Sequence, residues 1–308
     1  MSSSSSLLLL LFLLSLSGVK PTSGFKICAF NVQSFGDSKD NQLYTHLHTY
    51  THSQIVSRCD VCLLQEVRDS KQKAIPLLIT ELNSQNQYDY VASERLGRTP
   101  SYQEQYVFVF RIGSVTVTDQ YQYLDMLRGD EDAFSREPFI VRLHTRKTAI
   151  RDFVLVPQHT TPTNATKEID ALYDVFLDVK KKWKTEMVMF LGDFNADCGY
   201  VAKKNWQHVR LYSNQAFLWL IGDAEDTTVR ETTTCAYDRI VVHGEAFAKA
   251  IVPQSAQPFN FPKEYGLTEE QALDVSDHYP VEVELKAGSE HLGGHTLLIV
   301  LMAFFIST

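Results

Sequence analysis

Several apolar runs along the chain have the length of buried β-strands, and each of them ends in a polar side chain. Met187–Leu191 is followed by Asp193 and Asn195, and Val61–Leu64 is followed by Glu66. Short runs that are apolar at every position are typical of strands covered on both faces. Such strands deliver the residues that follow them to one edge of a sheet. We therefore predict that these oxygen-bearing side chains gather at one edge.

Two more strands of this kind are predicted at Phe25–Phe30, which ends on Asn31, and at Phe153–Val156, which His159 follows. Alternation and β-branched or aromatic content predict the other strands. These are Tyr88–Ser93, Tyr106–Phe110, Thr116–Tyr123, Ile240–His243 and Val281–Leu285.

Helical spacing of apolar residues appears in two segments. Gln42–Ser57 is the first, and the segment after Thr163 is the second, with one apolar face formed by Ile169, Leu172, Phe176, Val179 and Trp183. The second helix joins two predicted strands, as in the usual crossover between parallel strands. The range Glu94–Pro100 is expected to be a basic turn, and Trp206–Trp219 shows no clear period. The pattern as a whole is that of an α/β protein.

Composition narrows the class of protein. The 308 residues are 44% hydrophobic and 21% charged, and the formal net charge is -8. Such a chain can bury a large core in one domain or two. An acidic protein is not a passive binder of nucleic acid, because such binders depend on Lys and Arg displacing counterions. If the substrate is a polyanion, metal cations and a few placed arginines must offset the repulsion.

The first segment, residues 1–24, has the pattern of a secretory signal peptide. A serine run precedes the apolar stretch Leu7–Leu16, and the small residues Ser23 and Gly24 come just before Phe25. The apolar stretch is too short for the alternative, a membrane span. We predict that the chain enters the secretory pathway and that residues 25–286 form the folded domain.

The last segment, residues 287–308, has the pattern of a glycosylphosphatidylinositol (GPI) signal. Three small residues, 287–289, are followed by the polar spacer Glu290–His295 and the apolar run Thr296–Ile306. Eleven apolar residues are too few to cross a bilayer, which needs about 20. Small residues, a spacer and an apolar end form the anchor signal. The alternative is a tail that packs on the domain or is merely retained, so cell-surface and secreted forms both stay open.

The strand ends carry candidate metal ligands. Asp193 and Asn195 are two residues apart, so in an extended segment their side chains share one face and can hold a hard divalent cation. The alternative is that they only form a turn, and Glu66 taken alone could be a solvated carboxylate. An acid and a histidine also stand side by side at Asp277 and His278, directly before the final predicted strand.

Histidines add proton-transfer chemistry to this set. His159 taken alone is as well explained as a structural residue, but the chain also offers His278 and several strand-end acids and amides. These are Asn31, Glu66, Glu104, Asp193, Asn195, Asp238 and Asp277. One histidine could deprotonate an attacking water and the other protonate a leaving oxygen, each contributing about 100- to 10,000-fold. The inventory indicates metal-assisted hydrolysis of a phosphate ester, and no GxSxG, P-loop or HExxH motif supports another hydrolase type.

Three further features leave alternatives open. The acidic loop Asp125–Asp132, with Glu137 close behind, is either solvated or able to chelate calcium. Asn164 begins a glycosylation sequon, which fits an exposed loop of a secreted protein. Five cysteines allow two disulfides at most and leave one thiol over.

Seven motifs together resemble the deoxyribonuclease I family. They are FNVQSFG from Phe30, QEVRDS from Gln65, SYQEQYVFVFR from Ser101, FSREP from Phe134, GDFNADC from Gly192, CAYDRIVV from Cys235 and SDHYPVEV from Ser276. The resemblance runs in order from about residue 25 to residue 286. It implies a four-layer α/β sandwich of two packed mixed β-sheets flanked by helices, of the endonuclease/exonuclease/phosphatase type. It also implies a monomeric endonuclease that cuts double-stranded DNA with Mg²⁺ (or Mn²⁺) and Ca²⁺ and leaves 5′-phosphates.

The resemblance assigns roles to residues of this chain by position. His278 resembles the general base, partnered by Asp238, and His159 resembles the general acid, partnered by Glu104. The magnesium and phosphate site corresponds to Asn31, Glu66, Asp193, Asn195 and Asp277. The DNA-contacting positions correspond to Arg68, Tyr102, Arg136 and Arg98. Arginine and tyrosine suit a minor groove, where phosphate and sugar contacts give little sequence preference.

Cysteines and calcium ligands follow from the same resemblance. Cys198 and Cys235 match the structural disulfide of the family, whereas no cysteine lies between Asp125 and Asp132 to form its second, short-loop bridge. Cys28, Cys59 and Cys62 match no family bridge, and inert buried thiols are expected for Cys28 and Cys62. The calcium loops correspond to Asp125, Asp132, the Phe134 carbonyl, Glu137, Asp226 and Thr228.

Other readings remain open at this stage. Inositol polyphosphate phosphatases, neutral sphingomyelinases and abasic-site endonucleases resemble this chain in an Asn, a Glu and the final Asp-His. A non-catalytic actin binder is a further alternative. Tyr90 and Val91 match the actin-contacting strand of deoxyribonuclease I, but Ala92 and Phe139 depart from it, so we do not expect actin to bind.

Overall fold

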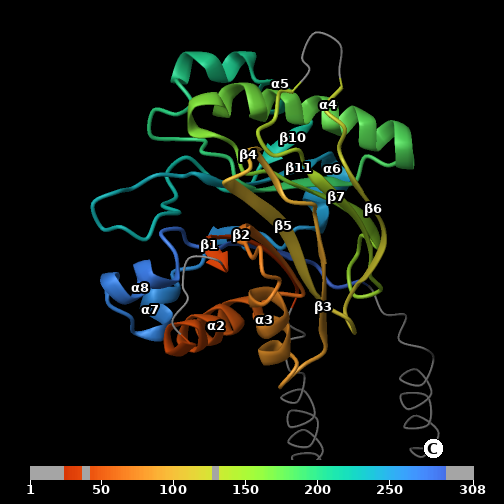
Figure 1. Cartoon of the computed structure of the whole chain (residues 1–308). Coiled ribbons are helices and arrows are strands. Elements are labelled where there is room, and N and C mark those ends of the chain that lie inside the picture. The colour runs from red at the N-terminus through yellow and green to blue at the C-terminus, as the bar shows by residue number, and fades with distance from the viewer. Residues whose placement is uncertain (1–23, 37–41, 127–131, 289–308) are drawn as a thin grey trace, which may run out of the picture.

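The structure is a computed structural model that describes residues 24–36, 42–126 and 132–288. Two β-sheets lie face to face in the middle of the molecule, and helices cover both outer faces (Figure 1). The predicted four-layer α/β sandwich is therefore confirmed. The predicted signal peptide, apart from Gly24, and the tail from Ser289 onward lie outside the described residues.

The first sheet has seven strands in the order β12-β13-β1-β2-β5-β3, with β4 paired to β5. Their bounds are β1 Phe25–Gly36, β2 Val61–Arg68, β3 Tyr88–Ala92, β4 Leu96–Thr99, β5 Tyr102–Arg111, β12 Gln257–Pro258 and β13 Val281–Leu285. Within this sheet β1 and β2 are parallel and the other pairs are antiparallel. The sheet is thus mixed, as predicted.

The second sheet has six strands in the order β10-β11-β9-β8-β7-β6. Their bounds are β6 Thr116–Gln122, β7 Phe139–His144, β8 Asp152–Pro157, β9 Val188–Asp193, β10 Phe217–Trp219 and β11 Asp238–His243. Only β8 and β9 are parallel. The helix α4 (Ala165–Trp183) joins them, which confirms the predicted crossover.

Each of the remaining helical segments either belongs to one of the two outer layers or connects strands. They are α2 Gln42–Val56, α3 Ala74–Leu82, η1 Pro162–Asn164, η2 Lys203–His208, α5 Arg210–Ser213, α6 Glu245–Ala250, α7 Phe261–Tyr265 and α8 Glu269–Val275. The helices α2, α3, α7 and α8 lie on the outer side of the seven-stranded sheet, and α4 and α5 lie over the six-stranded sheet (Figure 1).

Three apolar layers explain why the central strands read as continuous hydrophobic runs. Leu63 and Leu191 point into the core between the two sheets. Their neighbours Leu64 and Phe190 point to the opposite faces, into the layers under the helices. Because both faces of β2 and β9 are buried, every position must be apolar until the strand reaches its polar end.

The structure corrects some predicted element bounds. β1 does not end at Asn31 but continues to Gly36, because pairing with β2 is interrupted after Asn31 and resumes at Phe35. Gln33 and Ser34 absorb this irregularity with positive φ angles of 46° and 61°. The predicted turn at Glu94–Pro100 contains β4, and the unassigned range 206–219 forms parts of η2, α5 and β10.

The disulfide prediction was wrong for one pair of cysteines and correct for the other. Cys28 is not an inert thiol but forms a disulfide with Cys59, while Cys62 is the buried free cysteine. The reason is that Cys59 follows α2, which packs against the face of β1 that carries Cys28. Cys198 and Cys235 are bridged as predicted. Burial of Cys62 raises the pKa of its thiol above the ordinary range.

Within residues 24–36, 42–126 and 132–288, no helix combines the length and apolar content that crossing a bilayer requires.

Candidate active site

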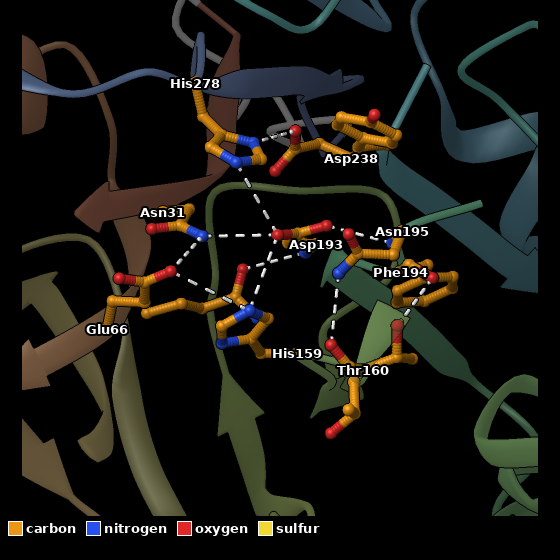
Figure 2. A network of polar contacts seen from close by, with 12 residues as sticks. Asn31, Glu66, His159, Thr160, Asp193, Phe194, Asn195, Asp238 and His278 are labelled. Carbon is orange, nitrogen blue, oxygen red and sulfur yellow. Dashed lines mark hydrogen bonds and ion pairs between the residues drawn. The ribbon is translucent and has the colours of Figure 1, made fainter. Parts of the chain in front are cut away.

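The polar strand ends of both sheets meet at one edge of the molecule. β1 brings Asn31, β2 brings Glu66 and β9 brings Asp193 to this edge. The antiparallel β11 begins there with Asp238, and His278 lies directly before β13. Figure 2 shows these side chains pointing toward a common centre at Asp193. The predicted gathering of strand-end residues is therefore what the structure shows.

The first histidine pair is His278 with Asp238. Their Nδ1 and Oδ2 atoms are 2.8 Å apart, and Asp238 is completely buried. The backbone N–H of His278 donates to the Ser276 hydroxyl, which in turn donates to the Asn31 carbonyl. Burial alone would lower the pKa of His278, but Asp238 and Asp193 outweigh it, and the pKa is raised well above the ordinary imidazole value.

The second histidine pair is His159 with Glu104. Their Nδ1 and Oε1 atoms are 2.6 Å apart, and both residues are buried. Arg136 places its Nε 3.0 Å from the same Glu104 oxygen and donates from a terminal nitrogen to the His159 carbonyl at 3.1 Å. The His159 N–H donates to the Tyr106 hydroxyl at 2.9 Å. The ring is therefore fixed from its Nδ1 side and through its backbone.

Charge sets the protonation of this second pair. Burial lowers the pKa of His159, Glu104 raises it more strongly, and Arg136 acts against Glu104, so the pKa ends above its ordinary value. Burial works to raise the pKa of Glu104, but His159 and Arg136 outweigh it and the pKa is lowered. The Glu104 carboxylate is thus held ionised between the His159 ring and the Arg136 guanidinium.

Asp193 lies between the two histidines. Its Oδ2 is 3.6 Å from Nε2 of His159 and 3.7 Å from Nε2 of His278. The Asn31 amide donates to this oxygen at 3.2 Å and to Oε1 of Glu66 at 3.1 Å. The reactive Nε2 atoms of both histidines therefore face one carboxylate from two sides (Figure 2). A phosphate group bound beside Asp193 would lie within reach of the Nε2 atoms of both histidines.

The outer part of the predicted metal set is less tightly grouped. The Asn195 N–H donates to Oδ1 of Asp193 at 2.9 Å, and its amide nitrogen donates to the Thr160 carbonyl at 3.1 Å. Asp277 is more exposed, with an oxygen 4.0 Å from Nε2 of His278. Asn195 and Asp277 thus border the centre that Asp193, Glu66 and Asn31 form.

The residues present fit a divalent cation. The ligand atoms of Asp193, Asp238 and His278 lie within 4.8 Å of one another, but Asp238 and His278 are bonded to each other, so Asp193 is the member of this group that can bind an ion. Glu66 adds a carboxylate that the Asn31 amide joins to Asp193. Like charges this close repel one another, and a hard cation with oxygen ligands relieves that repulsion. The donor set, mostly carboxylate and amide, is the kind that Mg²⁺ and Mn²⁺ take.

Comparison with known proteins decides the family. A family model described as "Endonuclease/Exonuclease/phosphatase family" matches residues 28–278. The chain is 50% identical to deoxyribonuclease gamma of Mus musculus over 283 residues, which is 91% of this chain and 89% of that protein. It is also 50% identical to deoxyribonuclease-1 of Homo sapiens over 264 residues, 85% and 92% of the two chains. This chain belongs to the deoxyribonuclease I family.

Solved structures support the fold at much lower identity. An endonuclease/exonuclease/phosphatase family protein from Bacteroides thetaiotaomicron gives a TM-score of 0.58 at 14% identity, covering 87% of this chain and 99% of that one. The human Nocturnin catalytic domain gives 0.57 at 14% identity, covering 86% and 94%. At this identity the similarity shows the sandwich and no more.

The residues predicted to contact DNA differ in how the structure places them. Arg68 and Tyr102 lie together at the rim of the site, with the guanidinium carbon 4.4 Å from the centre of the exposed ring. Arg136 is mostly buried against Glu104 and His159. Arg98 bonds instead to the end of the acidic loop, at the Asp132 carboxylate. Arg98 is exposed but tied to Asp132, so among these arginines Arg68 alone has no carboxylate partner within the described residues.

At the calcium positions implied by the family resemblance, some of the candidate oxygens accept hydrogen bonds from protein donors. At the first loop, Arg98 donates to the Asp132 carboxylate and to the carbonyls of Asp132 and Phe134, while Asp125 accepts from the Phe134 N–H. At the second loop, one oxygen of Asp226 accepts from the N–H and hydroxyl of Thr228. Hydrogen bonds thus engage part of each ligand set, and calcium binding at these loops stays a prediction. Residues 127–131 of the first loop lie outside the described part.

The glycosylation prediction concerns Asn164 at the end of η1. Its side-chain nitrogen donates to the Ala133 carbonyl at 3.2 Å. The amide that a glycan would modify is therefore engaged with the chain segment that follows the acidic loop.

Gln65 is a supporting residue that sequence reasoning did not single out. Its amide oxygen accepts from the Asp193 N–H at 2.9 Å, and its nitrogen donates to the Gln158 carbonyl at 2.7 Å. It thereby ties the seven-stranded sheet to the catalytic ends of β8 and β9. Gly192 makes room for it, because a Cβ there would lie 2.5 Å from the Gln65 amide nitrogen and φ is +128°. A polar residue inside the apolar run VCLLQEV was the available signal.

Thr227 supports the other end of the site in a similar way. Its hydroxyl accepts from the N–H groups of Tyr237 and Asp238 and donates to the Cys235 carbonyl. The Cys198–Cys235 disulfide holds the same segment, three residues before Asp238 and three after Asn195. These contacts join separate segments of the chain, and no local sequence pattern predicts them.

Proposed function

We propose that this chain is a metal-dependent endonuclease that hydrolyses phosphodiester bonds of double-stranded DNA and leaves 5′-phosphate ends. The observation that carries the proposal is the pair of histidines, each oriented by a buried carboxylate, whose Nε2 atoms face Asp193 at 3.6 and 3.7 Å. This is the arrangement that a two-proton hydrolysis requires. The names of the relatives, deoxyribonuclease gamma and deoxyribonuclease-1, supply the substrate.

The proposed reaction uses the two histidines in opposite senses. Water attacks phosphorus, and its proton passes to Nε2 of His278, whose imidazolium Asp238 stabilises. The bond from phosphorus to the 3′ oxygen breaks, and that oxygen takes the proton from Nε2 of His159. Phosphate stays on the 5′ side and a 3′ hydroxyl is formed. Asp238 and Glu104 keep the rings oriented throughout.

The proposed cation is Mg²⁺, or Mn²⁺ in its place, at the site that Asn31, Glu66, Asp193, Asn195 and Asp277 form. Glu66 and Asp193 offer carboxylate oxygens to it, and the Asn31 amide nitrogen holds both carboxylates in place. When bound, such a cation neutralises charge on the phosphate oxygens. This chain's own residues bind the phosphate, orient the water and move the protons. Calcium, which the family resemblance implies at the two loops, takes part in no step of the proposed reaction.

The proposed DNA surface is the rim beside the histidines. Arg68 and Tyr102 are placed to contact phosphate and sugar, and Arg136 and Arg98 border the same region. Such contacts hold a duplex in place without reading its sequence. We therefore propose little sequence preference.

The test measures nicking of supercoiled plasmid beside phosphate release from a sphingolipid and from an inositol polyphosphate. The proposal expects Mg²⁺-dependent nicking with fragments that ligate without prior phosphorylation, and no release from the other two substrates. Release without nicking would support the alternative of a phosphatase or lipid phosphodiesterase. Fragments that need a kinase before ligation would contradict the direction of cleavage.

We also propose that the protein enters the secretory pathway and is held at the cell surface by a GPI anchor attached near Gly288 or Ser289. In support, the described chain runs along β13 away from His278, and Leu285 pairs with Phe25 at the end of β1 opposite to Asn31. An attachment there leaves the catalytic edge open. Phosphatidylinositol-specific phospholipase should release activity from expressing cells. A mature protein that keeps the peptide with Phe304 and Phe305 would rule the anchor out.

A further inference from the structure

Four strands carry a residue of the active site at one end and a basic residue near the other. Arg136 precedes β7 and Lys147 follows it, and Arg151 precedes β8, which His159 follows. Asp238 begins β11, and Lys249 comes after it in α6. His278 precedes β13, and Lys286 follows it directly. Strands of five or six residues span roughly 17–20 Å, which separates the two ends of the molecule.

The basic residues stand on segments that hydrogen bonds join to one another around the point where the described chain ends. We call this surface the exit face, and its members are Arg146, Lys147, Arg151, Lys249 and Lys286. All five are exposed. Hydrogen bonds join their segments: Gly288 N–H to the Lys147 carbonyl at 2.8 Å, Ala149 N–H to the Lys286 carbonyl at 3.0 Å, and Lys286 Nζ to the Lys249 carbonyl at 2.6 Å. The Thr145 N–H donates to the Arg151 carbonyl at 2.8 Å.

The charge of the exit face is opposite to that of the chain. The net charge of the whole chain is -8, whereas the acids that neighbour the exit-face cations in sequence each face a basic side chain. Glu284, two residues before Lys286, pairs with Lys26 at 3.5 Å. Glu245 pairs with Lys249 at 2.7 Å, and Asp152 faces His144 at 3.1 Å. Among the described residues, no ion pair joins Arg146, Arg151 or Lys286 to a carboxylate. A local excess of positive charge on an acidic protein indicates an anionic partner.

The position of the chain end indicates which partner this is. The chain passes through the middle of the exit face at Gly288, and its sequence continues with seven residues, 289–295, before the apolar run Thr296–Ile306. Seven residues reach about 25 Å at most. Any membrane attachment of this end, through the apolar run or through a lipid that replaces it, therefore brings the exit face up to the bilayer.

We propose that the exit face docks on the outer surface of a bilayer whose exposed headgroups include anionic phospholipid, and that it turns the catalytic edge away from the bilayer. The docking rests on the proposed membrane attachment for its location but on the five cations for its affinity. Each Lys or Arg close to an anionic surface strengthens binding by about fivefold. The attraction falls off within about 8 Å at physiological salt, so it acts only when this face, and not the catalytic edge, meets the membrane.

The consequence for function is orientation. Anionic lipid repels a DNA duplex. A nuclease whose catalytic edge lay against the membrane would therefore be kept apart from its substrate. Docking through the exit face holds the histidines about a strand length further out. The protein can then cut DNA in the surrounding fluid while it stays bound.

The test uses the full chain and vesicles of two compositions. One set is phosphatidylcholine alone, and in the other about a third of the lipid is phosphatidylserine. The variant is Arg146→Gln/Arg151→Gln/Lys286→Gln, and the matched control is Lys203→Gln/Lys204→Gln/Lys263→Gln, which changes the net charge equally. Lys203 and Lys204 follow the catalytic end of β9, and Lys263 lies in α7. Thermal unfolding of both variants confirms that they fold.

The variant is expected to lose about 100-fold in partition onto anionic vesicles at low salt, with no loss on neutral vesicles, while the control keeps its anionic binding. Plasmid nicking in solution is expected to be unchanged in both. Equal losses in variant and control, or no loss in either, would overturn the proposal. A loss of duplex DNA binding with unchanged vesicle binding would assign the surface to nucleic acid instead. If the unchanged chain does not nick plasmid, the proposed nuclease activity is wrong. Vesicle binding is measured separately, so its result still tests the docking.

Discussion

The two histidine pairs of this protein share one geometry and differ in the charges around them. In both pairs Nδ1 bonds to a buried carboxylate and Nε2 faces Asp193. The His159 pair also holds the Arg136 guanidinium, 3.0 Å from Glu104. Around His278, by contrast, the charged neighbours are carboxylates, with Asp193 and Asp277 beside Asp238.

This difference separates the roles of base and acid. A ring surrounded by carboxylates gains most from taking up a proton, which is what a general base does. A guanidinium next to the other pair makes the second imidazolium easier to deprotonate, which suits a general acid. The structure therefore supports the assignment of His278 as base and His159 as acid by a physical argument that is separate from the family resemblance.

The largest expected effect comes from removing the carboxylate charge of each pair in turn. Asp238→Asn should lower kcat by about 10,000-fold, because no other residue stabilises the imidazolium through Nδ1. Glu104→Gln should cost about 100-fold, since Arg136 and Tyr106 still hold the His159 backbone. Single-turnover cleavage of a duplex oligonucleotide measures both. Equal losses in the two variants would remove the distinction drawn between the pairs.

A smaller effect is expected from Gln65, which supports the carboxylate that both pairs share. Gln65→Leu leaves the Asp193 N–H and the Gln158 carbonyl without their partner, so Asp193 shifts. We expect kcat to fall about 10- to 100-fold and the Mn²⁺ concentration for half-maximal rate to rise. The exposed Gln85→Leu is the control and should behave like the unchanged chain. An unaltered metal requirement in Gln65→Leu would show that the residue serves stability alone.

The pH dependence distinguishes the two pairs through the base. The pKa of His278 is raised above its ordinary value of 6.5, so below that pKa the ring is protonated and cannot accept a proton. The acid limb of kcat/KM should therefore rise with pH and have its midpoint above 6.5. Asp238→Asn removes the main charge that raises the pKa, so the limb should move to lower pH. A limb that stays in place in this variant would count against His278 as the titrating base.

The smallest expected effect on catalysis comes from the disulfide beside the His278 pair. Replacing Cys198 and Cys235 by alanine opens a loop with a sequence separation of 37 and should lower the free energy of unfolding by roughly 3 to 4 kcal/mol. Activity at low temperature should fall only a few-fold, because Thr227 still holds Asp238. The matched variant Cys28→Ala/Cys59→Ala, with a separation of 31, should lose similar stability. Denaturant unfolding without any loss in either variant would contradict this.

Local pattern predicted the site better than it predicted what supports the site. Asp193 and His159 follow apolar runs, and strands must end where burial on both faces ends, so sequence alone placed them at one edge. The Cys28–Cys59 bridge depends on how α2 lies over β1, which no local pattern encodes. The burial of Arg136 against Glu104 likewise arises only when the segment before β7 packs beside β5.

The most direct test of the account is the plasmid-nicking rate of His278→Ala, His159→Ala and the double variant at saturating Mg²⁺. We expect each single variant to fold normally and to lose at least about 100-fold. The double variant should lose much less than the product of the two single losses, because the two groups act in one step. Near-normal nicking by both single variants would contradict the assignment of these histidines as the acid and the base.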